Sequence, residues 1–231
     1  MHSENVNICF KQMDFFTQNQ LFFIYVINLS VIAYVRYTNF GFIKKILIAA
    51  VNYNTAQQVQ KSEINKKSIT NIFLSLNFYI SAIVFSVYLL SNRNLIPPEI
   101  NHFIIFISIF FVIFLIIYLK AGINFLFASV FKLKEIAFDF HRNNNISYRA
   151  MGIILFIINI LMSFSSISNT AFFTGVIIII FFYLLRILRY IKINLSKQMN
   201  SFYLFLYLCA VEILPILYIV KFLTLYYSPT N

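Results

Sequence analysis

The stretch from Ile100 to Leu119 reads INHFIIFISIFFVIFLIIYL, and it decides the fold of this chain. It contains no Lys, Arg, Asp or Glu, and it has the length of about 20 residues that an α-helix needs to cross a bilayer. Five further stretches of the sequence share this character. We therefore predict six membrane-spanning helices, at about 16–37, 69–90, 100–119, 150–168, 172–191 and 202–223.

The composition of the whole chain agrees with this prediction. Of its 231 residues, 61% are hydrophobic and only 11% are charged, whereas soluble domains carry about 25% charged residues. An ordinary soluble protein is thereby excluded, and so is a disordered chain, which needs few apolar residues and many charges. The predicted fold class is all-α: a polytopic transmembrane helix bundle that forms a single integral membrane domain over residues 1–231.

The positive charges predict an orientation. If the N-terminus is outside, the loops at 36–68, 120–149 and 186–200 face the cytoplasm and contain fifteen of the eighteen Lys and Arg residues, leaving Lys11, Arg93 and Lys221 outside. This distribution favours both termini on the outer, periplasmic face. Because the basic residues flank apolar runs and no basic–aromatic platform lies outside them, we expect no nucleic-acid partner. The first twenty residues lack the pattern of a signal peptide, so the first apolar run is expected to remain as a span.

Two segments do not fit the pattern of simple spans. In residues 41–68, an apolar face of Ile43, Ile46, Leu47, Ala50 and Val51 predicts an amphipathic helix in the membrane interface. Residues 121–140 are apolar but short between charges. They are compatible with an interfacial helix, a re-entrant segment or a cytoplasmic extension of the third span, and Gly122 is expected to mark a break.

Glu212 is the outstanding candidate for function, because it lies near the middle of the last predicted span. An intramembrane acid is costly and is by default a functional hypothesis. Pro215 leaves the carbonyl of Val211 without its helical partner, and Cys209 shares the face of Glu212. The functional interpretation is a proton- or ion-handling carboxylate, or a contact for a basic group on a partner. The structural alternative is a Glu that pairs with Asn, Tyr or Arg186 of a neighbouring span.

Other polar residues have expected roles as well. Arg186 and Arg189 close the fifth span, where ion-pair or headgroup contacts are expected. A second loop, FDFHRNNNISYRAMG, is expected to be solvated or to dock a soluble partner. Its candidate residues are Asp139, His141, Arg142 and Arg149. Polar residues inside the spans, among them Asn28, Ser81, Asn159 and Ser163, are expected to form hydrogen bonds between helices.

No catalytic constellation can be assembled from the sequence. It contains no P-loop, GxSxG, HExxH or CxxC motif, and Cys9 and Cys209 provide neither a disulfide framework nor metal-ligand spacing. We therefore predict no catalytic residues, metal or cofactor. The leading hypothesis is a subunit or scaffold of a membrane assembly, with the lipid bilayer and other membrane proteins or further copies of the chain as partners. The alternative is a small transporter or proton-coupled component that uses Glu212.

The last predicted span contains LYLC-x-x-EILP, from Leu206 to Pro215. This string resembles the C-terminal signature of a family of small multi-pass inner-membrane proteins of Bacteroidota, a domain of unknown function. The resemblance implies an inner-membrane location and draws attention to Cys209, Glu212 and Pro215. It implies no reaction, substrate or cofactor.

Overall fold

The structure, a computed structural model, describes residues 18–65, 69–92, 102–130, 134–165, 167–196 and 221. Within these ranges the secondary structure is helical, which confirms the all-α fold class. The helices are α2 (Gln18–Thr38), α3 (Phe42–Val51), α4 (Tyr53–Asn65), α5 (Ile69–Asn92), α6 (His102–Val130), α7 (Lys134–Phe164) and α8 (Ser168–Ser196).

Five of these helices are long and apolar enough to cross a membrane, so the chain is a membrane protein. The candidate spans are Leu21–Thr38, Ile69–Ser91, Ile104–Val130, Ala137–Phe164 and Ser168–Ile193. The sixth predicted span, at 202–223, lies outside the described residues.

The segment after α2 forms two short helices. Gly41 allows the chain to turn there, because its φ of 88° is a left-handed conformation that residues with a Cβ rarely adopt. The amphipathic character predicted for this segment is confirmed in α3, where Ile46 and Ala50 are buried. Val51 does not share this face, since it lies exposed at the end of α3. Asn52 is extended and separates α3 from the polar helix α4.

The prediction of a long loop at 120–149 is wrong. Helix α6 continues through Gly122 to Val130, so the break expected at Gly122 is also wrong and this part of the chain extends the third span. Helix α7 already begins at Lys134, which places Asp139, His141, Arg142 and Arg149 on a helix. Several of the polar residues that suggested a loop instead form hydrogen bonds with neighbouring helices, namely Asn143, Asn144, Tyr148 and Arg149.

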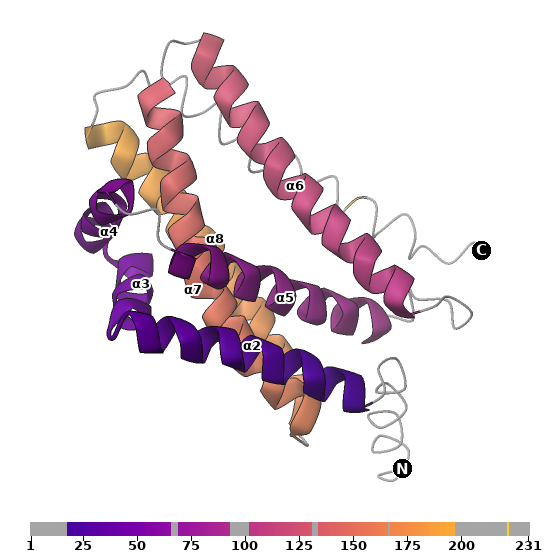
Figure 1. Ribbon diagram of the computed structural model, residues 1–231. Coiled ribbons are helices and arrows are strands. Elements are labelled where there is room, and N and C mark those ends of the chain that lie inside the picture. Colours follow the sequence, from indigo (N-terminus) through magenta and orange to yellow (C-terminus); the bar gives the residue numbers. More distant parts are fainter. Residues whose placement is uncertain are drawn as a thin grey trace.

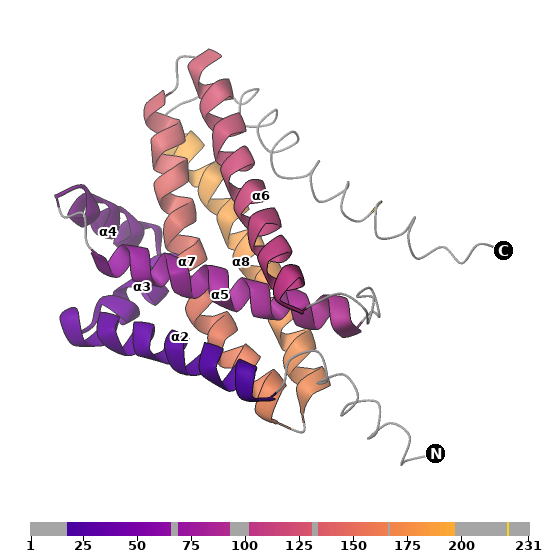
Figure 2. The same ribbon diagram turned by 45° about the vertical axis from the view of Figure 1, so that its right-hand side comes forward.

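The helices are arranged in two crossing groups (Figures 1 and 2). Helices α2 and α5 lie side by side and cross the antiparallel pair α7 and α8, while α6 lies along the side of the bundle. The most extensive contact joins α5 to α7. The end of α6, the start of α7 and the end of α8 gather at one end of the molecule, which we call the basic end.

Two glycines permit this crossing. A Cβ added to Gly152 of α7 would lie 2.5 Å from the Cα of Phe78 on α5, so only glycine lets the two backbones approach this closely. On α8, a Cβ added to Gly175 would lie 2.5 Å from the ring of Phe85. Gly152 thus lets the backbones of α5 and α7 approach, and Gly175 leaves room on α8 for the ring of Phe85.

Hydrogen bonds between spans reinforce the packing. The Nδ2 of Asn28 on α2 donates to the Oγ of Ser81 on α5, at 3.2 Å. The Nδ2 of Asn159 on α7 donates to the backbone carbonyl of Ser81, at 2.8 Å. The hydroxyls of Tyr25 and Ser163 lie 2.6 Å apart and join α2 to α7. The interhelical role predicted for Asn28, Ser81, Asn159 and Ser163 is thereby confirmed.

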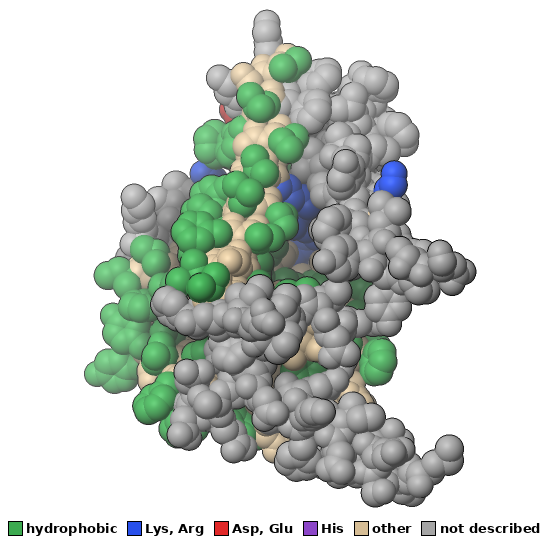
Figure 3. Space-filling model, turned by 90° about the vertical axis from the view of Figure 1, so that its right-hand side faces the viewer, with side chains coloured by type: hydrophobic (Ala, Val, Ile, Leu, Met, Phe, Trp, Pro, Cys, Tyr) green, Lys and Arg blue, Asp and Glu red, His purple; other side chains and the backbone are tan. Residues whose placement is uncertain are grey.

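Helix α6 has the least buried surface of the five candidate spans. Its inner side packs on α5 through Ile109 and its neighbours, while Phe111, Leu115 and Leu126 are exposed. Figure 3 shows hydrophobic side chains along this helix and Lys or Arg side chains in the recess beside it. An apolar surface this continuous suits contact with lipid tails or with another membrane helix.

Candidate functional site

Two arginines near the C-terminal end of α8 lie inside the bundle. Arg186 and Arg189 stand three residues apart, and their side chains are only 6% and 4% exposed. Buried charges are stable only when their hydrogen-bonding capacity is satisfied. The partners of these two side chains therefore define the site.

Arg186 is held by two tyrosines. Its Nε donates to the hydroxyl of Tyr190 at 2.7 Å, and its Nη1 donates to the hydroxyl of Tyr148 on α7 at 2.8 Å. Its Cζ lies 5.1 Å from the ring centroid of Tyr148 and 5.6 Å from that of Tyr190, so both rings also stabilise the cation. Tyr190 donates onward to the Oδ1 of Asn144 at 2.5 Å. This chain of bonds joins α8 to α7.

Arg189 joins three helices. Its Nη1 donates to the Oδ1 of Asn143 on α7 at 2.7 Å, and its Nη2 donates to the backbone carbonyl of Ala49 on α3. Ala49 lies in the last turn of α3, where carbonyl groups lack partners within the helix and the helix dipole favours a positive charge. Arg189 therefore supplies the C-terminal cap of a helix that lies far away in the sequence.

Arg149 adds a third buried cation on α7. Its side chain is buried, and its Nε lies 3.4 Å from the Oγ of Ser75 on α5, which is a long hydrogen bond. We call Arg149, Arg186 and Arg189 the arginine cluster. It lies toward the basic end of the bundle and contacts α3, α5, α7 and α8.

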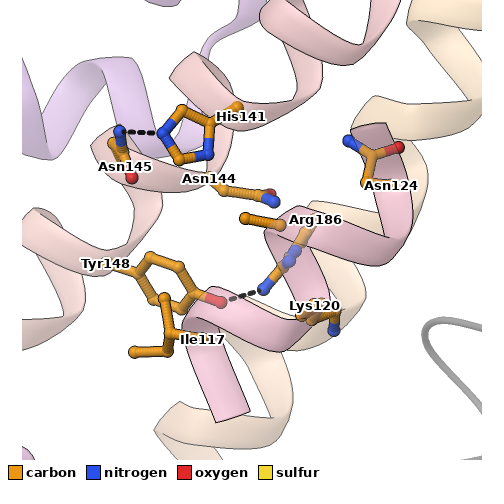
Figure 4. A pocket seen from close by; sticks show the side chains of 9 residues that line it. Ile117, Lys120, Asn124, His141, Asn144, Asn145, Tyr148 and Arg186 are labelled. Atoms are coloured by element: carbon orange, nitrogen blue, oxygen red, sulfur yellow. Dashed lines mark hydrogen bonds between the residues drawn. The ribbon is translucent and has the colours of Figure 1, made fainter. Parts of the chain in front are cut away.

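A small interior cavity adjoins the cluster (Figure 4). Its volume is about 20 Å³, which suits a single water molecule. The side chains of Asn144, Tyr148 and Arg186 converge on it, with Lys120 and Asn124 on its α6 side. The Oδ1 of Asn124 is buried and has no hydrogen-bond partner among the described residues. A water in this cavity would find several polar groups within its walls.

A larger and more open cavity lies between the junction of α3 with α4 and the end of α8. Its volume is about 430 Å³, and we call it the α3–α8 cavity. Its walls are formed by Val51, Asn52, Tyr53, Leu185, Leu188, Arg189 and Lys192. The cavity thus combines two cations with an apolar rim.

The remaining sequence predictions have mixed outcomes. Glu212, Cys209 and Pro215 lie outside the described residues, so their roles stay predictions. The guanidinium groups of Arg186 and Arg189 both bond to protein atoms inside the bundle. The headgroup contacts expected of these two residues stay a prediction.

The predicted docking residues divide between surface and interior. Arg149 is buried against α5, whereas Asp139, His141 and Arg142 are half-buried near the start of α7. His141 pairs with Asn145 of its own helix at 3.3 Å. That Asp139, His141 and Arg142 dock a soluble partner stays a prediction. The surface that they would offer belongs to helix α7 and not to a loop.

Sequence reasoning missed the tyrosines and asparagines that bind the arginines. The signal was present in the run Asn143, Asn144 and Asn145, followed by Tyr148, which would place polar groups on neighbouring faces of a helix. In the part of the chain that the structure describes, no three His, Cys, Asp or Glu side chains come together as a metal site.

A known family model matches most of the chain. The family model described as Domain of unknown function (DUF4271) matches residues 21–223. No curated protein and no solved structure matches the chain.

Proposed function

The chain belongs to the DUF4271 family, and from this premise we propose that it is an integral inner-membrane subunit or scaffold of a membrane protein assembly. Its role in this proposal is to hold helices in a fixed arrangement and to offer its outer apolar faces to partners. No catalysis is proposed.

The observation that carries this proposal is that the buried polar side chains form hydrogen bonds between helices. Arg186, Arg189 and Asn159 each bond to a different helix from their own. The interior cavity beside the arginine cluster has room for about one water molecule and not for a substrate. Polar residues arranged in this way hold the helices in a fixed arrangement.

The proposed orientation places both termini in the periplasm. In a chain whose successive spans alternate in direction, the ends of α2, α6 and α8 belong on the same side of the membrane. The basic residues near that side include Lys44 and Lys45 on α3 and Lys192 on α8. The positive-inside rule assigns this side to the cytoplasm, and the inner-membrane location is the one that the C-terminal signature implies.

Purification from native membranes tests the scaffold proposal. The tagged chain is extracted in mild detergent, and the co-eluting proteins are identified and quantified beside an unrelated tagged inner-membrane protein. We expect a partner, or further copies of the chain, in fixed stoichiometry. A chain that elutes alone as a monomer would contradict the proposal.

The second candidate is a proton-coupled component that uses Glu212. It is favoured by the polar interior cavity, which is lined by Lys120, His141 and Arg186 and is large enough for one water molecule. A water held among such groups can pass a proton between them. The substitution Glu212→Gln keeps hydrogen bonding but removes ionisation, and Glu135→Gln, at an exposed site on α7, is its control. If this candidate is right, proton flux into vesicles containing the protein stops in the Glu212 variant alone. Absence of flux in the wild-type protein would exclude it.

A further inference from the structure

The α3–α8 cavity has features of a ligand site that the scaffold role does not use. We propose that it binds the phosphate headgroup of an anionic phospholipid, with the acyl chains lying along α8. This inference concerns a site apart from any protein partner, so it can fail without affecting the proposed function.

The positive charge of the cavity is concentrated on two side chains. Arg189 and Lys192 both line it, and neither forms an ion pair with any residue that the structure describes. Arg189 donates to Asn143 and Ala49, and these bonds hold it in place while leaving part of its five-donor guanidinium available. The Nζ of Lys192 lies 5.1 Å from the ring centroid of Tyr53, which positions the ammonium group at the cavity.

Neutral hydrogen-bond donors complete the polar wall. The hydroxyl oxygen of Tyr53 accepts a bond from the Nε2 of Gln57 at 2.9 Å, so its own hydrogen can be donated to a ligand. Tyr53 is also the first residue of α4, whose first turn contains no acidic residue. An anion in the cavity would therefore meet two cations, a phenol and the positive end of a helix dipole.

The rim selects a ligand that also has an apolar part. Leu188 is 60% exposed and Val51 is 64% exposed, although both line the cavity. The apolar surface continues along α8 through Leu184 and Ile180, which are also exposed. A free phosphate would leave this surface unused, whereas a lipid would cover it with its acyl chains.

The depth of the cavity matches the position of a headgroup. Lys192 stands one residue before the end of the candidate span Ser168–Ile193, at the boundary between apolar and polar surroundings. Basic pockets at this level between membrane helices are known to bind anionic headgroups. The volume of about 430 Å³ also falls in the usual range for small-molecule sites.

A lipid titration tests the proposal. The purified full-length protein is placed in phosphatidylcholine nanodiscs, and phosphatidylglycerol is added while lipid retention is followed by native mass spectrometry and stability by thermal unfolding. The variant Lys192→Gln is compared with Lys45→Gln, which removes another exposed charge, on α3 outside the cavity. We expect Lys192→Gln to weaken phosphatidylglycerol binding roughly fivefold, the effect of one basic residue near an anionic membrane, and Lys45→Gln to leave it unchanged.

A second pair of variants tests the role of the rim. Leu188→Ser should lose affinity for phosphatidylglycerol, and Leu115→Ser, at an exposed site on α6 away from the cavity, should retain it. Wild-type binding in Lys192→Gln, or equal losses in both lysine variants, would overturn the site. Inorganic phosphate that stabilises the protein as strongly as phosphatidylglycerol would overturn the lipid assignment and identify a site for free anions.

Discussion

The Cα of Phe78 on α5 lies so close to Gly152 on α7 that a Cβ at residue 152 would stand 2.5 Å from it. This backbone contact sits in the most extensive helix interface of the molecule. It fixes how α5 crosses α7 and, through them, where the arginine cluster is assembled.

Gly152→Ala is expected to destabilise the protein. The added methyl group would meet backbone atoms, which cannot move aside as a flexible side chain can, so we expect a loss of about 1–3 kcal/mol or more. The control is Gly122→Ala on α6, where an added Cβ has nothing within 4 Å and alanine is the better helix former. Thermal unfolding in detergent should show a lower midpoint for the first variant only. Equal midpoints for the two variants would contradict the close approach.

Arg189→Lys should weaken the attachment of α3 although it keeps the charge. A lysine cannot reproduce the planar fork that bonds to Asn143 and Ala49 together. We expect the free energy of unfolding to fall by roughly 1–3 kcal/mol, because a buried group is left without its partner. The measurement is limited proteolysis, in which cleavage near residues 39–41 should become faster. Arg36→Lys, at an exposed site on α2, is the matched control and should cleave at the wild-type rate.

Tyr190→Phe should destabilise the protein by weakening the attachment of the Arg186 side chain. The substitution removes the acceptor of the Arg186 Nε and the donor to Asn144 while keeping the ring beneath the cation. A cost of about 1–3 kcal/mol is expected, because these bonds involve a buried charge. Tyr37→Phe serves as the comparison, since Tyr37 is exposed. Indistinguishable denaturation curves for the two variants would rule out the tyrosine bond as a stabilising element.

Asn159→Leu should cost about 0.6 kcal/mol, and at most about 1.7 kcal/mol, which is the range for hydrogen bonds between membrane helices. The side chain of Asn159 donates to α5, and Leu is of similar size but cannot donate. In Ser86→Ala, by contrast, only a bond to the carbonyl of Ala82 on the same helix is lost. The prediction fails if Ser86→Ala destabilises the protein as much as Asn159→Leu.

The positions of the described spans could be predicted because they depend on local composition. The span predicted at 69–90 corresponds to α5, which ends at Asn92, since about twenty predominantly apolar residues without a charge have few alternatives to a membrane helix. Residues 134–149 were mistaken for a loop for the same reason. Their Asn, Arg and Tyr side chains lower the local hydropathy, and the bonds that Asn143, Asn144 and Tyr148 form with α8 are not encoded in any local pattern.

The candidate site could be predicted only in part. The sequence indicates that Arg186 and Arg189 are candidate contact residues at the end of a span. The direction of their side chains into the bundle depends on Tyr148 and Asn143, which lie on another helix. The α3–α8 cavity depends on a contact between Lys192 and Tyr53 that no local pattern encodes. Glu212 remains a prediction from the sequence, outside the described residues.

The bond between Arg189 and Ala49 also sets an order of events during biosynthesis. The two residues are 140 positions apart, and ribosomes add about 5–20 residues per second, so α3 emerges roughly 7–28 s before the arginine that caps it. During that interval the last turn of α3 must find hydrogen bonds in water or in lipid headgroups. Capping of α3 by Arg189 is consequently a late step, which follows the insertion of α8, and a nascent chain arrested before α8 should leave the last turn of α3 accessible to labelling reagents.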